Sequence, residues 1–217
     1  MNPAVVIPFR PADPERIANY KRTSSQWETL GWPVYAADSD GEYFARSQAI
    51  NRAAALASEN GADVFFIHDC DCLLKTLDQA VKAVTIAFEK DAYVVAFSRM
   101  DVFDWDETYA VRAGADPKTQ RVLESVGLSW GNAFAISRVL FERVKGFDEG
   151  FRSYGCEDLA FNESVERLGE RFRVPGVVYH LRHPTPERVE MYENNVRYNR
   201  YRQATTVEEM QAIIDER

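Results

Sequence analysis

The amino-acid sequence predicts an α/β fold, with a mostly parallel central sheet flanked by helices in a single domain. Short, uncharged apolar runs at residues 5–7 and 64–67 are typical of strands buried on both faces of a sheet. Longer stretches with helical patterns separate such runs, which is the order of βαβ units. The chain has 217 residues, of which 46% are hydrophobic, so it is long enough to bury one sizeable core.

The expected elements alternate along the chain. They are strands over residues 5–7, 33–37, 63–67, 92–97, 133–136 and 174–180, and helices over 14–30, 44–60, 76–90, 137–146, 157–168 and from 187 onward. The first helix has Asp13 as its N-cap, Pro14 at its first position and Gly31 after its end. The second helix is rich in alanine and ends before Gly61.

The later helices carry similar boundary signals. Thr76 and Gln79 form a capping-box pattern at the start of the third helix. Ser137 is the expected N-cap of the fourth helix, and Gly169 closes the fifth. Residues 99–128 lack clear periodicity, and we expect a long loop there, which is either a lid over a bound substrate or a solvated surface loop.

Composition and charge disfavour several classes of protein. Lys and Arg number 26 against 34 Asp and Glu, a net charge of −8, and non-specific nucleic-acid binding needs clustered positive charge instead. No apolar run approaches the roughly 20 residues of a transmembrane helix, and the first residues lack the basic start of a signal peptide. Three cysteines, an odd number, give no disulfide framework. We therefore expect a cytoplasmic protein.

Two carboxylates follow the most apolar predicted strand. Asp69 and Asp71 flank Cys70 in a D-x-D pattern, and alternation along an extended chain points both to the same side. Like charges this close need a cation nearby. A divalent ion that also bridges to a diphosphate would supply it. An ordinary acidic loop is the alternative interpretation.

A second acidic pair opens the helix at 157–168. Glu157 and Asp158 lie where the helix dipole favours negative charge. They are either ordinary first-turn residues or a general base that accepts a proton from an attacking hydroxyl. Gly150 and Gly155 nearby would let a substrate approach the backbone.

Two of the three histidines follow the last predicted strand. His180 and His183 are three residues apart, and the third, His68, precedes Asp69. Imidazole beside carboxylates suits manganese-like ions, whereas a single histidine is more often structural.

Taken in order, these motifs resemble a known family. They lie at residues 6–10, 44–51, 66–71, 130–134, 146–149, 156–161 and 179–180. Their order over residues 4–183 resembles the GT-A glycosyltransferases, and is most similar to the family-2 enzymes and to the β-1,4-galactosyltransferase type with its Glu-Asp motif. Cys70, in the middle of the D-x-D, departs from the usual aliphatic or serine residue, and we expect it to face the core.

The resemblance implies a donor site and a metal site. The donor nucleotide and sugar would contact Pro8, Phe9, Arg10, Asp38, Arg46, Asp69, Trp130 and Gly131. Mn²⁺, or Mg²⁺ in its place, would bind Asp71 and Asp69 together with His180, with His183 as the rival ligand.

The resemblance also implies an activity. The enzyme would be an inverting, metal-dependent hexosyltransferase that uses a nucleoside diphosphate sugar, UDP being the usual nucleotide, and an acceptor hydroxyl of unspecified class. Asp158 would be the catalytic base, and Glu157 would bind sugar hydroxyls. Residues 1–186 would form the catalytic domain, with a donor half over about 1–98 and an acceptor half over about 99–186. Residues 187–217 would be a helical extension.

Two other functions fit the same architecture. A nucleotidyltransferase usually carries a glycine-rich, basic phosphate loop after its first strand, and residues 8–12 contain no glycine. A non-catalytic nucleotide-sugar or carbohydrate-binding module would not need both Asp71 and Asp158, and both are present. Fold resemblance does not by itself decide among these functions.

Overall fold

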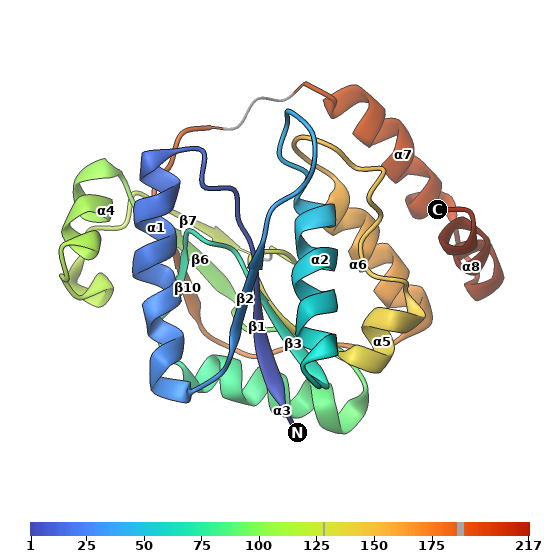
Figure 1. Cartoon of the computed structure of the whole chain (residues 1–217), viewed down its shortest axis with the longest axis horizontal. Coiled ribbons are helices and arrows are strands. Elements are labelled where there is room, and N and C mark those ends of the chain that lie inside the picture. The colour runs from blue at the N-terminus through green and yellow to red at the C-terminus, as the bar shows by residue number, and fades with distance from the viewer. Residues whose placement is uncertain (128, 186–188) are drawn as a thin grey trace.

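A six-stranded sheet forms the centre of the computed structural model, which describes residues 1–127, 129–185 and 189–217 (Figure 1). In the order β2-β1-β3-β8-β5-β9, its strands are Val34–Ala37, Pro3–Pro8, Val64–His68, Ala133–Ser137, Tyr93–Val95 and Arg171–Arg173. Only β8 is antiparallel to its neighbours among these strands. The expected mostly parallel sheet is confirmed. β1 and β3 are buried along nearly their whole length because helices cover the sheet.

Helices surround the sheet (Figure 1). They are α1 Pro14–Ser24, α2 Arg46–Glu59, α3 Asp78–Lys90, α4 Trp105–Arg112, α5 Arg138–Arg143, α6 Glu157–Leu168, α7 Met191–Gln203 and α8 Val207–Asp215, with 3-10 turns at Ser25–Leu30 and Pro117–Thr119. The helical extension is therefore α7 and α8, which both pack on α6. The expected domain boundary between residues 186 and 187 lies outside the described residues. None of the described helices is long and apolar enough to cross a membrane.

A second, four-stranded sheet was not expected from the sequence. In the order β4-β10-β6-β7, its strands are Cys72–Leu74, Val177–His180, Arg99–Val102 and Glu124–Gly127. The expected strand at 174–180 is thus shorter, and β9 before it belongs to the central sheet.

The expected long loop at 99–128 is wrong for the described residues 99–127, which hold β6, α4, a 3-10 turn and β7. The usual apolar pattern of a strand is missing from β6 because the strand contains polar residues. Asp101 is buried there, but its carboxylate is paired with Arg99 and Ser125. The sheet packs on a small separate core made of Leu73, Phe103, Val111, Tyr179 and Leu181.

Most helix boundaries follow their sequence signals. Asp13 caps α1, and Ser137 caps α5 by accepting a hydrogen bond from Leu140 N at 3.0 Å. The capping box at the start of α3 is only half right. Gln79 Oε1 accepts from Thr76 N at 3.1 Å, but Leu77 is the N-cap. Gln79 Nε2 donates to Ala96 O at 2.8 Å, just after β5, and to Val177 O at 3.2 Å in β10, so it ties the helix to both sheets.

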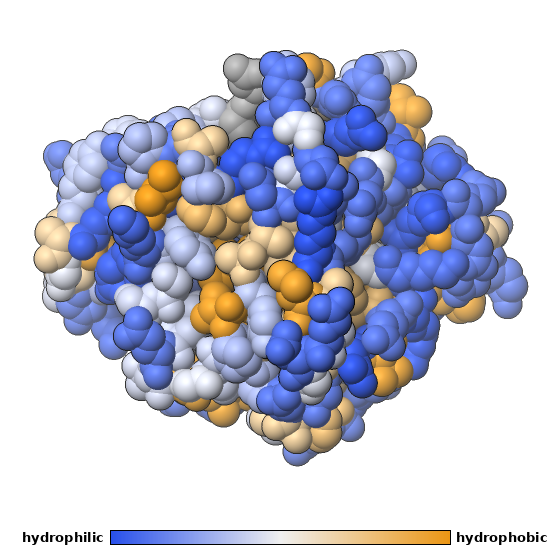
Figure 2. All heavy atoms as spheres, viewed as in Figure 1, coloured by the Kyte–Doolittle hydropathy of each residue, from blue (hydrophilic) through white to orange (hydrophobic). Residues whose placement is uncertain are grey.

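The surface in the view of Figure 1 is mainly hydrophilic, with hydrophobic residues in small separate groups (Figure 2). This agrees with a chain in which 28% of the residues are charged. β1 and β3 end at the edge of the central sheet near which α2 and α6 begin (Figure 1). In a parallel sheet this edge is the usual place for a ligand.

Candidate functional site

The second sheet brings Asp71 and both histidines together. Asp71 lies between β3 and β4, and His180 of β10 pairs with Cys72 in the antiparallel β4–β10 ladder. Leu181 N donates to Asp71 O at 2.8 Å, which holds the two segments side by side. His183 Nε2 lies 3.2 Å from Asp71 Oδ2, and His180 Nε2 lies 3.7 Å from Asp71 Oδ1. One ligand atom from each of the three residues lies within 4.8 Å of the others.

This group has the chemistry of a divalent-metal site. A carboxylate oxygen with two imidazole nitrogens is a donor set that suits Mn²⁺ and similar ions. Burial acts to raise the pKa of Asp71, but His180, His183 and Arg16 outweigh it and keep that pKa below the usual value. Burial lowers the pKa of His183, which favours the neutral ring that a metal requires. The residues present therefore fit the metal that the sequence predicted.

Sequence reasoning missed Arg16, which completes this group. Its Nη1 lies 3.7 Å from Asp71 Oδ2, and its Nη2 lies 3.0 Å from His183 Nδ1. Nothing in the sequence around α1 signals this contact, because it joins residues that are more than 50 positions apart.

Asp69 has different partners from Asp71. Arg46 donates through Nε to Asp69 Oδ1 at 2.9 Å, and Asn132 Nδ2 donates to Oδ2 at 3.2 Å. Burial raises the pKa of Asp69, and Arg46 opposes this rise. Among the described residues, Asp69 is not part of the group that could hold a metal. Asn132 belongs to the 130–134 motif, but the sequence carries no signal for its contact with Asp69.

Arg46 also reaches the second acidic pair. It is the first residue of α2, and its Nη1 lies 3.6 Å from Glu157 Oε1 at the start of α6. Burial and the neighbouring Asp158 raise the pKa of Glu157 to about 7, despite Arg46. One buried guanidinium therefore joins the end of β3 to the start of α6.

Asp158 lies against Gly131. Its Oδ1 accepts a hydrogen bond from Leu159 N at 2.8 Å. A Cβ on Gly131 would lie 3.2 Å from Asp158 Oδ2. Any larger residue at Gly131 would therefore crowd this carboxylate, so glycine lets the backbone pass close to it.

The side chain and backbone of Trp130, the residue before Gly131, are held by several contacts. The guanidinium carbons of Arg171 and Arg173 lie 4.4 and 4.6 Å from the centroids of its rings. The Tyr93 hydroxyl donates to Trp130 O. These cation–π contacts and the hydrogen bond fix the residue that precedes Gly131.

The predicted nucleotide residues lie after β1 and β2. Arg10 Nε donates to Asp38 Oδ1 at 2.8 Å, and Nη2 donates to Ser39 O at 2.6 Å. Phe9 stacks on Tyr20 with ring centroids 4.2 Å apart, and Pro8 is buried at the end of β1. The parallel pairing of β1 with β2 places Arg10 and Asp38 together.

The chain is similar in structure to several solved glycosyltransferases. The catalytic domain of Drosophila β1,4-galactosyltransferase 7, in complex with xylobiose, matches with a TM-score of 0.59 at 15% identity, over 95% of this chain and 82% of that one. A mannosyltransferase from Pyrobaculum calidifontis with GDP-Man and Mn²⁺ matches with a TM-score of 0.52 at 16% identity, over 99% and 68%. S. aureus TarS 1-349 with UDP matches with a TM-score of 0.51 at 12% identity, over 100% and 70%.

No protein-family model matches the sequence, and no curated protein does. At identities this low the structural likeness establishes the fold alone. The chain has the GT-A fold of these glycosyltransferases, as its sequence predicted.

Proposed function

We propose that the protein is an inverting, metal-dependent glycosyltransferase. It transfers a hexosyl group from a nucleoside diphosphate sugar, with UDP as the nucleotide, to an acceptor hydroxyl. The observation that carries this proposal is the joining of two acidic pairs by Arg46, which contacts Asp69 at 2.8 Å and Glu157 at 3.6 Å. The group that could bind a cation, which includes Asp71, therefore lies at the same edge of the fold as the second acidic pair.

The donor site is assigned to the end of β1 and β3. Asp71, His180 and His183 would hold Mn²⁺. When bound, such an ion stabilises the negative charge on a departing diphosphate. Asp38 and Arg10 would contact the nucleotide, in line with their pairing at the end of the parallel strands β1 and β2. Drosophila β1,4-galactosyltransferase 7 with manganese and UDP-Gal and the mannosyltransferase with GDP-Man support this class of donor.

Asp158 is assigned the role of general base. The acceptor hydroxyl oxygen attacks the anomeric carbon, and the bond from that carbon to the diphosphate oxygen breaks. The hydroxyl proton goes to Asp158, and the nucleoside diphosphate leaves with the bonding electrons. Attack from the face opposite the leaving group inverts the configuration in one displacement, so the enzyme needs no nucleophile of its own. The close approach of the Gly131 backbone to this carboxylate supports the choice, because any side chain at residue 131 would crowd Asp158.

Glu157 is assigned to substrate hydroxyls. Its carboxylate forms an ion pair with Arg46, and its side chain is 13% exposed. With a pKa of about 7, it is partly protonated near neutral pH and both donates and accepts hydrogen bonds. It is also the alternative base if Asp158 proves dispensable.

A panel of nucleotides with and without Mn²⁺ tests this function. We expect UDP and UDP-sugars to raise the melting temperature only in the presence of Mn²⁺, because a ligand that binds the folded state stabilises it. Asp71→Asn should abolish this metal-dependent shift. The control Asp215→Asn removes an exposed carboxylate on α8 and should leave the shift unchanged.

The outcomes separate the parts of the proposal. A shift with GDP-sugars instead would keep the activity and change the donor. Shifts that do not depend on Mn²⁺ or on Asp71 would contradict the metal site. No shift with any nucleotide would contradict the donor site and favour a protein that binds carbohydrate without catalysis.

A further inference from the structure

Arg16 contacts two of the three proposed metal ligands and has no part in the mechanism above. Its guanidinium lies 3.7 Å from Asp71 Oδ2 and 3.0 Å from His183 Nδ1. All three side chains are mostly buried, with exposures of 25% for Arg16, 8% for Asp71 and 15% for His183. A cationic side chain therefore already offsets the carboxylate that a divalent ion would need.

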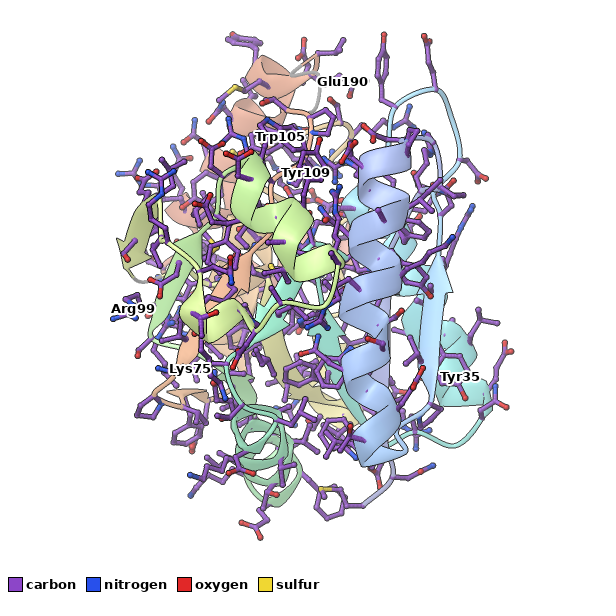
Figure 3. All side chains as sticks on the ribbon, turned by 90° about the vertical axis from the view of Figure 1, so that its left-hand side faces the viewer. Tyr35, Lys75, Arg99, Trp105, Tyr109 and Glu190 are labelled. Carbon is purple, nitrogen blue, oxygen red and sulfur yellow. The ribbon has the colours of Figure 1, made fainter. Side chains whose placement is uncertain are left out.

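The helix that carries Arg16 is held on both sides of it. Arg112 of α4 donates through Nε to Asn19 Oδ1 at 2.8 Å and through Nη2 to Glu15 O at 2.9 Å. Asn19 Nδ2 donates to Arg182 O at 3.1 Å, in the segment that carries both histidines. Figure 3 shows α4 beside α1, with Trp105 and Tyr109 on it. Arg16 is thus directed at the site from a fixed backbone.

The ring of His183 cannot serve Arg16 and a metal ion at once. A neutral imidazole has one N–H and one lone pair. If Nδ1 accepts from Arg16, then Nε2 carries the proton and faces Asp71 Oδ2 at 3.2 Å. A metal at Nε2 requires the lone pair there, which leaves the proton on Nδ1. Pro184 O lies 2.8 Å from Nδ1 and would accept that hydrogen bond.

We propose that Arg16 is a resident cation that competes with the divalent ion for Asp71 and His183, and that it moves to the diphosphate when the nucleotide binds. This inference rests on the proposed metal and donor site. A diphosphate bound to an ion at Asp71 would lie beside Arg16, which contacts that carboxylate, and guanidinium groups bind phosphate oxygens through paired N–H donors. The nucleotide removes the competitor, so the binding of metal and of nucleotide becomes mutually favourable.

Mn²⁺ binding to the full chain tests the proposal, with the free ion measured by its electron paramagnetic resonance signal. The wild type, Arg16→Gln and Lys21→Gln are titrated with Mn²⁺, each with and without UDP. Lys21 is the matched control, because it is an exposed residue of α1 and its substitution removes the same charge. Without UDP we expect Arg16→Gln to bind Mn²⁺ at least about fivefold more tightly than the wild type, the lower end of ordinary coupling energies. Lys21→Gln should match the wild type.

The effect of UDP gives a second readout. UDP should tighten Mn²⁺ binding less in Arg16→Gln than in the wild type, because no competitor remains to be removed. Arg16→Lys keeps the charge and loses the forked geometry, so it should bind Mn²⁺ with an affinity between those of the wild type and Arg16→Gln. If Arg16→Gln folds poorly, Arg16→Lys still tests whether Arg16 competes with the metal ion.

Asp71→Asn separates the two levels of the proposal. If it loses Mn²⁺ binding while Arg16→Gln binds as weakly as the wild type, the metal site stands and the role of Arg16 is overturned. If Asp71→Asn binds Mn²⁺ like the wild type, the metal site itself is wrong and the role of Arg16 falls with it.

Discussion

The two acidic pairs of the site lie on different elements but divide in the same way. Asp69 and Asp71 follow a strand, whereas Glu157 and Asp158 begin a helix. In each pair the first carboxylate contacts the guanidinium of Arg46. The distance is 2.8 Å from Nη2 to Asp69 Oδ1 and 3.6 Å from Nη1 to Glu157 Oε1. The second carboxylate of each pair has other neighbours. One buried arginine thus contacts the first carboxylate of each pair, and the second carboxylates are those proposed as metal ligand, Asp71, and as general base, Asp158.

The two remaining carboxylates differ in their surroundings. The side chain of Asp71 is 8% exposed and faces histidine nitrogens, which together suit a cation. Asp158 is less buried and lies close to the backbone of Gly131, where any side chain would crowd its carboxylate. The proposed roles of Asp71 and Asp158 follow from this difference between their neighbours.

The largest effect is expected from Asp158→Asn. Removing a general base lowers turnover by about 10²- to 10⁴-fold, while metal-dependent UDP binding should stay intact because Asp158 is not a metal ligand in the proposal. The measurements are kcat with saturating donor and acceptor, and the melting-temperature shift with UDP and Mn²⁺. Glu163→Gln is the control on the same helix and should keep near-normal turnover. Normal turnover in Asp158→Asn would instead move the base to Glu157.

The next largest effect is expected from Arg46→Met, on stability. The substitution leaves Asp69 and Glu157 buried without their cation, and breaking a buried ion pair in this way costs about 3–5 kcal/mol. The measurement is the free energy of unfolding in urea near pH 8, where both carboxylates are most strongly driven to ionise. Arg52→Met on the same helix should cost far less, because Arg52 pairs with Asp40 in solvent. Equal losses for the two variants would show that Arg46 does not join the pairs.

The sequence predicts the strands of the central sheet other than β9, because their signal is local. The runs at 5–7 and 64–67 are apolar on both faces, and Asp13, Pro14 and Ser137 mark helix starts through contacts within three residues. The second sheet has no such signal. Its strand β6 contains Arg99 and Asp101, and it is stabilised by pairing with β10, far away in sequence.

The site was predictable in its residue types but not in its pairings. The pattern Asp-Cys-Asp indicated two carboxylates at a cleft, but not that Asp69 would contact Arg46 and Asn132 while Asp71 met the histidines. Those contacts depend on the register of β4 with β10 and on where α2 begins. Arg16 could not be found from sequence for the same reason.

The smallest of the three effects is a pH dependence carried by Glu157. Burial and Asp158 outweigh Arg46 and raise the pKa of Glu157 to about 7 in the folded protein, from 4.5. As pH rises between these values the unfolded chain releases this proton first, so the raised pKa makes the folded state progressively less stable. Glu157→Gln has no such proton, and its stability relative to the wild type should therefore increase by about 2 kcal/mol from pH 5 to pH 8. Urea unfolding of both proteins at the two pH values measures this difference.

Asp158→Asn in a parallel experiment should lower the pKa of Glu157 by removing a neighbouring charge. The stability of Asp158→Asn should therefore depend less on pH than that of the wild type. A Glu157→Gln advantage that stays constant with pH would mean that Arg46 keeps the pKa of Glu157 at its ordinary value. Glu157 would then differ from Asp69, whose pKa burial raises despite the same arginine.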